Sequence, residues 1–111
     1  MMRLILLILL FSASHAWAQE TVTLFVTSET TDTVNVYRGA VPGLAFVKGI
    51  PVGREPHNLG ISPDGRWVAT SDRRSGEVSI INTQSLTEAA RLKLGRQTHA
   101  ASLLDACAFS V

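Results

Sequence analysis

Apolar and polar residues alternate with a period of two in short runs along most of the chain from residue 22 onward. Val, Ile, Thr and aromatic residues dominate these runs, which is the composition of β-strands that bury one face. The runs are TVTLFVTSE, DTVNVYR, GLAFVKGIPV, HNLGIS, RWVATS, EVSIIN and ARLKLG. Turn residues such as Gly, Pro and Asp separate them, so the pattern predicts an all-β fold of antiparallel hairpins.

The segment ISPDGRWVATSD predicts one hairpin in detail. In its turn, Ser62-Pro63-Asp64-Gly65, proline presets φ for the second position, aspartate suits the third, and glycine can adopt the left-handed conformation that follows. A type I turn followed by such a glycine is a common three-residue hairpin loop. We therefore expect residues 59–62 and 66–71 to be neighbouring antiparallel strands.

One segment carries a competing pattern. Residues 85–94, SLTEAARLKL, place Ser85 three residues before Glu88, the spacing of a capping box at the start of a helix. Leu92 and Leu94 keep the strand-like alternation, so a strand is the prediction there and a helix is the alternative.

The strand pattern occurs twice. Thr27-Ser28-Glu29 matches Thr70-Ser71-Asp72 at an offset of 43, Val34-Asn35-Val36 matches Val78-Ser79-Ile80 at 44, and Val52-Gly53-Arg54 matches Leu94-Gly95-Arg96 at 42. His57 also matches His99 at an offset of 42. Self-similarity at roughly 40–45 residues, with about four strands per period, is the signature of a propeller blade.

The repeat resembles the YVTN-type β-propeller repeat. The matching pieces are GISPDGRWVATSD, GEVSIINTQSLTEAARLKLG and IPVGREPHNLGIS, and the resemblance covers residues 22 to about 102. It implies about two four-stranded antiparallel blades in an incomplete ring over residues 19–99, with a partial blade at 22–56 and a complete blade at 57–95. Related propellers include the haem d1-binding domain of cytochrome cd1 nitrite reductases and quinoprotein amine dehydrogenase-like proteins.

The resemblance also assigns the strands. The complete blade has its innermost strand at 57–62, followed by 66–71, 77–82 and 88–94. Residues 22–28, 33–37 and 44–52 supply the last three strands of the preceding blade, and residues 99–104 begin a third blade.

The first 18 residues have the pattern of a secretory signal peptide. A basic start at Arg3 precedes an apolar run at 4–11 and an Ala16-Trp17-Ala18 triplet of the kind that signal peptidase cleaves. We expect a signal-peptide helix over residues 1–18, cleavage before Gln19, and a periplasmic or secreted protein without a membrane anchor. An uncleaved anchor is the alternative, but the run is far shorter than the roughly 20 residues that span a bilayer.

Cleavage would leave 111 − 18 = 93 residues, little more than two repeats. Propellers close with about 4–8 blades, and open stacks need about three repeats. We therefore expect a fragment or truncated member of a longer propeller, with residues 100–111 as a degenerate tail. The alternative is a small β-protein that self-associates through its exposed blade faces.

The charge and cysteine content narrow the classes of partner. Residues 19–111 contain nine Lys/Arg and nine Asp/Glu, so their net charge is 9 − 9 = 0 with neutral His. This balance gives no electrostatic reason to expect nucleic acid or an anionic membrane as partner. The single cysteine, Cys107, forms no disulfide within the chain, and no CxxCH motif for covalent haem occurs.

The candidate ligand-binding residues come from the repeated connection between blades. His57 and His99 begin innermost strands, so both are candidates to face the central channel and to ligate a metal or a haem iron. Arg54 and Arg96 recur beside them and are candidates to bind an anionic ligand or the carboxylates of a cofactor. The alternative for all four is a repeated turn with solvated charges, because two histidines are fewer ligands than a metal site needs.

The remaining polar residues give no catalytic assignment and no metal site. Asp64 is explained by its turn, and Asp72 and its counterpart Glu29 are expected to be exposed after strand ends. The sequence therefore predicts a non-enzymatic binding scaffold without a cofactor, for a protein or small ligand. The competing hypothesis is a periplasmic redox propeller, related to the haem d1 or dehydrogenase class, with haem near His57 or His99.

Overall fold

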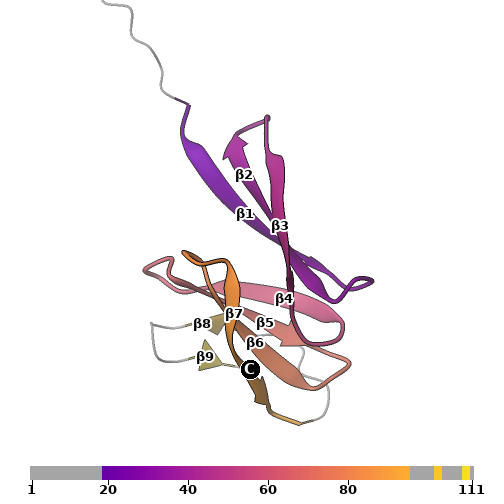
Figure 1. The fold of residues 1–111 in the computed structure, drawn as a ribbon. Coiled ribbons are helices and arrows are strands. Elements are labelled where there is room, and N and C mark those ends of the chain that lie inside the picture. Colours follow the sequence, from indigo (N-terminus) through magenta and orange to yellow (C-terminus); the bar gives the residue numbers. More distant parts are fainter. Residues whose placement is uncertain (1–18, 96–101, 104–108, 111) are drawn as a thin grey trace, which may run out of the picture.

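A computed structural model describes residues 19–95, 102–103 and 109–110, which form nine β-strands and no helix (Figure 1). No helix in these ranges has the length and apolar character to cross a membrane. The predicted signal-peptide helix lies outside the described residues. The strands are β1 (Thr21–Ser28), β2 (Thr33–Ala40), β3 (Ala45–Pro51), β4 (Pro56–Ile61), β5 (Trp67–Asp72), β6 (Glu77–Asn82), β7 (Thr87–Lys93), β8 (Ser102–Leu103) and β9 (Phe109–Ser110).

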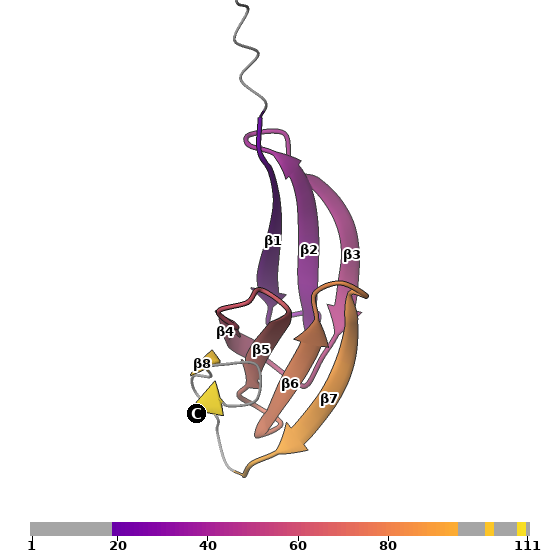
Figure 2. The ribbon, with the colours of Figure 1, turned by 90° about the vertical axis from the view of Figure 1, so that its left-hand side faces the viewer.

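The strands pair with their neighbours in chain order. β1-β2-β3 form one antiparallel sheet, β4-β5-β6-β7 form a second, and β8 pairs with β9. This arrangement confirms the all-β prediction: the second sheet has the four strands of one complete blade, and the first has the three strands of a partial blade. The two larger sheets lie one above the other without closing a ring (Figure 2).

The helical alternative at residues 85–94 is wrong, because the segment forms the turn before β7 and β7 itself. The side chain of Asn82 accepts hydrogen bonds from the N–H groups of Gln84 and Ser85, at 2.9 and 3.1 Å. Leu86 has a left-handed φ of 55°, which a right-handed helix does not allow. Asn82 therefore ends β6 in a tight turn instead of allowing a helix to begin.

The register refines the internal repeat. Ser28 pairs with Thr33 at the end of the first hairpin, as Asp72 pairs with Glu77 in the second, so 72 − 28 = 44 is the offset. The sequence alignment of Thr27-Ser28-Glu29 with Thr70-Ser71-Asp72 is therefore wrong by one residue. Asp72 corresponds to Ser28. Each residue of β1 and β2 therefore has its counterpart 44 residues later, on the same face of the second sheet.

The main core lies between the two sheets. Val34, Val36 and Ile50 from the first sheet meet Val68 and Ile81 from the second, and all five are almost completely buried. Burial of such a side chain stabilises the fold by about 1.5–3 kcal/mol. The opposite face of the second sheet buries a smaller cluster, and β8 lies against β4 and β5. Each blade is thus held mainly through its neighbour.

The turn at residues 62–65 has the hydrogen bonds of a capped hairpin loop. The N–H of Gly65 donates to the Ser62 carbonyl at 2.9 Å, and Gly65 has a φ of 72°. The Ser62 hydroxyl donates to the Asp64 carboxylate at 2.6 Å, and that carboxylate accepts the N–H of Arg66 at 3.0 Å. These bonds, the Ser62 bond first, lower the pKa of Asp64.

We expect Gly65→Ala to lower the free energy of unfolding by about 1–2 kcal/mol, because a left-handed φ is strained for an L-residue. An added Cβ meets nothing within 4 Å, so the loss comes from the backbone alone. Gly65→Asn is the matched control and should lose less, since Asn tolerates this conformation. Urea unfolding followed by circular dichroism measures both, and equal stability of all three proteins would contradict the prediction.

Candidate functional site

His57 joins the two blades. It lies in β4, and its Nδ1 contacts the Glu29 carboxylate in the turn between β1 and β2. The Thr27 hydroxyl in β1 donates to the His57 carbonyl at 3.3 Å. The contact with His57 lowers the pKa of Glu29. The imidazole predicted to be a ligand is therefore engaged between blades, while its predicted counterpart His99 lies outside the described residues.

Arg54 is exposed in the connection between β3 and β4. Its backbone N–H donates to the Ser75 hydroxyl at 3.0 Å, and its carbonyl accepts the N–H of Arg74 at 3.1 Å. The backbone of Arg54 is therefore held by two hydrogen bonds to the second blade. Arg96, its predicted counterpart, lies outside the described residues, so the pairing of the two arginines on one face stays a prediction.

The connection at residues 52–55 has four consecutive N–H groups, and each has an acceptor in one of the two blades. Val52 and Glu55 donate to the backbone carbonyl and the side chain of Asp32, at 3.0 and 2.9 Å. Gly53 donates into the second blade, to the Asp72 carboxylate at 3.1 Å. Arg54 also donates into the second blade, as described above. The hydrogen bonds of the connection thus fix the position of one blade relative to the other.

Asp72 is the buried centre of this network. One carboxylate oxygen accepts the N–H of Gly53 and the Ser79 hydroxyl at 2.6 Å, and the other accepts the Thr70 hydroxyl at 2.9 Å. The side chain is fully buried, so the expectation that Asp72 is exposed was wrong. Burial raises its pKa, and the bonds from Ser79, Thr70 and Gly53 act in the opposite direction. Through these bonds Asp72 ties the connection at Gly53 to the second blade.

Gly53 is required by the same network. A Cβ at this position would lie 2.6 Å from the Asp72 Cβ and overlap the carboxylate. Two sequence signals could have revealed the site: the recurring glycine in VGR and LGR, and the polar residues Thr70 and Ser79 at inward strand positions. Neither signal identifies the Asp72 carboxylate as the acceptor of the Gly53 N–H, because that pairing depends on which strand faces the connection.

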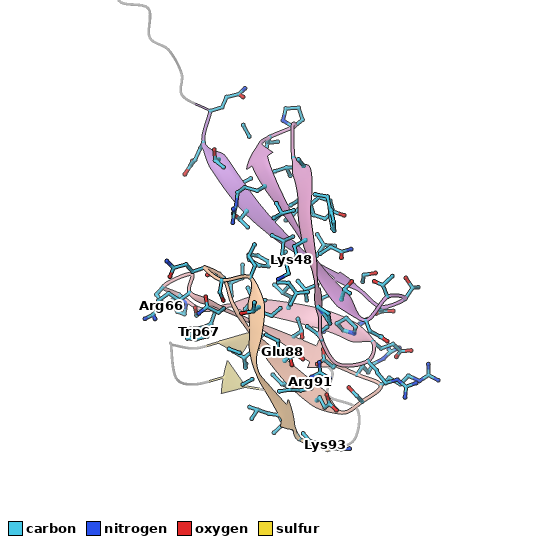
Figure 3. All side chains as sticks on the ribbon, in the orientation of Figure 1. Lys48, Arg66, Trp67, Glu88, Arg91 and Lys93 are labelled. Carbon is cyan, nitrogen blue, oxygen red and sulfur yellow. The ribbon has the colours of Figure 1, made fainter. Side chains whose placement is uncertain are left out.

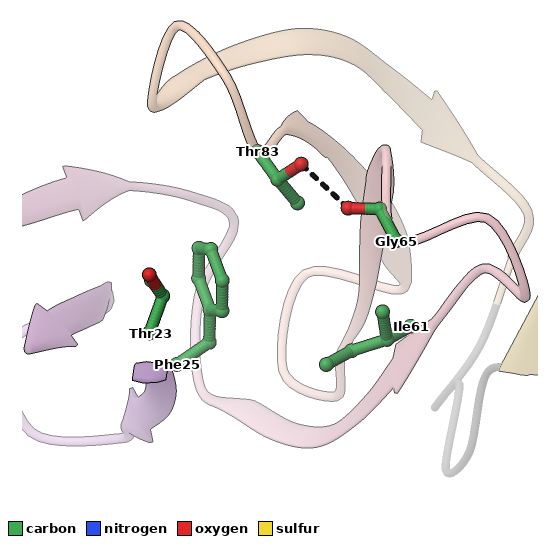
Figure 4. A pocket seen from close by; sticks show the side chains of 5 residues that line it. All are labelled: Thr23, Phe25, Ile61, Gly65 and Thr83. Carbon is green, nitrogen blue, oxygen red and sulfur yellow. Dashed lines mark hydrogen bonds between the residues drawn. The ribbon is translucent and has the colours of Figure 1, made fainter. Parts of the chain in front are cut away.

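A cavity of 280 Å³ lies between β1 and the turns of the second blade (Figure 4). Sequence reasoning did not find it, because its lining comes from three separate parts of the chain. Thr83 donates to the Gly65 carbonyl at 2.6 Å and closes one side. The lining residues are Thr23, Phe25, Ile61, Gly65 and Thr83. This lining combines two large apolar side chains with two hydroxyl groups, and none of the five residues is charged.

The outer face of the first blade exposes apolar side chains. Leu24 is 44% exposed and Phe46 is 60% exposed, and Phe46 packs edge-on against Tyr37 with ring centroids 5.6 Å apart. The equivalent positions of the second blade, 44 residues later, include Val68 and Ile81, which are completely buried under the first blade. We define the outer face as Val22, Leu24, Val26, Asn35, Tyr37, Phe46 and Gly49, which share one side of the sheet by register.

In the part of the chain that the structure describes, no group of three His, Cys, Asp or Glu side chains could hold a metal ion.

Two solved structures resemble this fold. Hydrazine synthase of Kuenenia stuttgartiensis matches with a TM-score of 0.63 and 20% identity, over 72% of this chain and 22% of that chain. The Cps50 (Swd1) β-propeller domain of Myceliophteria thermophila matches with a TM-score of 0.53 and 12% identity, over 76% of this chain and 31% of that chain. No family model and no curated protein matches the chain.

The chain therefore spans less than a third of each of these two structures. The likeness shows that the described residues have the fold of part of a β-propeller. It confirms the propeller expected from the repeat, whereas membership of the YVTN-type family stays a prediction.

We expect the free energy of unfolding of the wild type, relative to that of Asp72→Asn, to increase as the pH falls. The folded state raises the pKa of Asp72 above its ordinary 3.8, so the native protein takes up this proton before the unfolded chain does. Stability from Asp72 therefore rises as pH drops through the raised pKa and levels off below 3.8. Urea unfolding over a pH series measures the difference.

Asp64→Asn is the matched control with the opposite sign, because the fold lowers the pKa of Asp64 and its contribution is lost in acid. Asp72→Ala should cost about 2–5 kcal/mol at neutral pH, because the buried hydroxyls of Thr70 and Ser79 lose their acceptor and the Gly53 N–H keeps only the Ser79 hydroxyl. A pH-independent difference for Asp72→Asn would contradict the assigned direction.

Proposed function

We propose that this protein is an exported, non-enzymatic binding scaffold of the YVTN-repeat kind, which docks through the outer face of its first blade. The partner that we propose for this face is a second copy of the chain. The signal-like N-terminal segment supports export, and the SPDG-type repeat supports the family. The partial blade supports docking, because a blade is stabilised by its neighbour.

One comparison within the chain carries this proposal. The same blade face occurs twice, 44 residues apart. In the second blade it is covered by the first blade, and Val68 and Ile81 are completely buried there. In the first blade its apolar residues remain exposed. Exposed apolar surface of this kind, with a buried copy beside it, is typical of a docking surface.

The charge pattern supports a second copy as the partner. All residues of the outer face are uncharged, and the neighbouring charged residues Arg38 and Lys48 lie on the inner side of the sheet. Arg38 donates there to the Thr23 hydroxyl at 3.2 Å, and Lys48 donates to the Leu86 carbonyl at 3.0 Å. Two such faces can therefore meet without like-charge repulsion, in a two-fold arrangement in which each contributes the same patch.

We expect the full chain, expressed in a Gram-negative host, to be recovered from the periplasm without residues 1–18 and to self-associate with rising concentration. Leu24→Asp and Phe46→Asp should each weaken association at least about tenfold, because each buries a charge in the interface. Light scattering after size exclusion, with intact mass, measures both properties.

Val41→Asp is the matched control: Val41 is 63% exposed but lies beyond β2, in the turn before β3, outside the outer face. It should leave association unchanged. A chain that stays monomeric at all concentrations, or that associates equally with Phe46→Asp, would refute docking through this face. Retention in the cytoplasm at full mass would refute export.

A redox role is the competing proposal, and His57 is the observation behind it. Its ring is partly exposed where the edge strands β1 and β4 approach each other, which is a position open to a ligand. We rank this role second, because the Glu29 carboxylate already contacts Nδ1.

The visible spectrum separates the two roles. We expect protein from a haem-producing periplasm to show no Soret band, because the scaffold proposal includes no haem ligand. His57→Ala is the companion variant and Arg54→Ala the control. A Soret band that His57→Ala removes and Arg54→Ala keeps would overturn the scaffold in favour of the redox role.

A further inference from the structure

The two larger sheets have four edge strands, and three of them carry features that discourage a further strand. These features are charged side chains, prolines and bulges in the pairing. β3 contains Lys48 and Pro51, β4 begins at Pro56, and β7 carries Glu88, Arg91 and Lys93 (Figure 3). Each of these strands also has a bulge in its pairing.

β1 is the exception. Its sequence, TVTLFVTS, contains no charge, no proline and no glycine, and all eight residues pair with β2 in unbroken register. Among the described residues no strand pairs with its other edge, which is the side of β1 away from β2 in Figure 2. A long, regular and uncharged edge is a ready template for another strand.

The second blade shows what such an edge accepts. β5 is the counterpart of β1, and β5 pairs on both sides, with β6 and with β4. β4 lies antiparallel to β5, with Leu59 opposite Thr70, Gly60 opposite Ala69 and Ile61 opposite Val68. Subtracting the offset of 44 from these β5 positions gives Val26, Phe25 and Leu24 of β1.

We propose that the free edge of β1 binds an extended strand of a partner polypeptide, antiparallel and in the register that β4 has on β5. This inference rests on the proposed scaffold function and adds a second kind of partner to it. The partner strand carries two apolar residues, opposite Leu24 and Val26, with a small residue between them opposite Phe25. Backbone hydrogen bonds supply affinity, and alternate side chains supply specificity.

The surroundings of β1 fit this partner. The two apolar residues of the added strand extend the exposed row of Val22, Leu24 and Val26 on the outer face. On the inner side, Thr23 and Phe25 line the 280 Å³ cavity, which leaves room for the partner side chain opposite Thr23, two residues after the small residue. β1 carries no charge, so the side chains of β1 itself favour neither an acidic nor a basic partner.

The test uses a labelled peptide with the sequence of residues 54–63, REPHNLGISP, as the probe. We expect it to bind the full chain, measured by fluorescence anisotropy. Neighbouring amides of a strand point to opposite sides, so N-methylation at Leu59 and at Gly60 should differ. One of the two methylated peptides should bind as the parent does, and the other should lose at least about tenfold in affinity.

Chain variants locate the peptide. Val26→Lys, on the paired edge, should weaken binding at least about tenfold, whereas Phe46→Asp, on β3, should leave it unchanged. Circular dichroism confirms that both variants remain folded, and Leu24→Lys replaces Val26→Lys if the latter unfolds.

The inference is overturned by no binding of the parent peptide, by equal binding of both methylated peptides, or by loss of binding with Phe46→Asp. If the Phe46→Asp variant still self-associates and the peptide competes with that association, the edge of β1 binds a second copy of the chain. This result would also overturn the inference. Absence of peptide binding in a chain that still associates through the outer face would leave the proposed function intact.

Discussion

The hydrogen bonds of residues 52–55 determine how the two blades lie against each other. Four consecutive backbone N–H groups each find an acceptor, two on Asp32 of the first blade and two in the second blade. An unpaired buried amide costs about 1–3 kcal/mol, so displacing either blade would break several bonds together. The buried carboxylate of Asp72 is tolerated because three donors satisfy it: the hydroxyls of Thr70 and Ser79 and the N–H of Gly53.

Blade packing follows from this connection. With the connection fixed, Val34 and Val36 meet Val68 and Ile81, and the two sheets bury a common core. Each blade has two faces, and two stacked blades cover only the faces between them. The outer face of the first blade is therefore exposed for a geometric reason, while its composition is that of a buried surface. The proposed docking surface and the main core are two copies of the same structural element.

Local features of this fold could be predicted from the sequence, and features that depend on register could not. The turn at Ser62–Gly65 is specified by its own residues, and β4 and β5 lie within one residue of the bounds 57–62 and 66–71 that the resemblance assigned. Asp72 was expected to be exposed because a carboxylate after a strand usually is. Its burial depends on Gly53, nineteen residues earlier, and on an offset of 44 where sequence matching gave 43. The cavity is lined by three separate segments of the chain, so no local sequence pattern indicates it.

The edge of β1 shows how function can be inferred from a missing protective feature. Edge strands expose unpaired backbone groups that can pair with another strand. β3, β4 and β7 each carry a proline, a charge or a bulge, and these features discourage such pairing. If β1 served only as an outer boundary, the same features would benefit it, and a single lysine at Leu24 would supply one without disturbing the core, because Leu24 is on the outer face. Instead β1 keeps the composition of a central strand. The strand beside its counterpart β5 is then the best available guide to what β1 binds, because both edges are built from the same repeat.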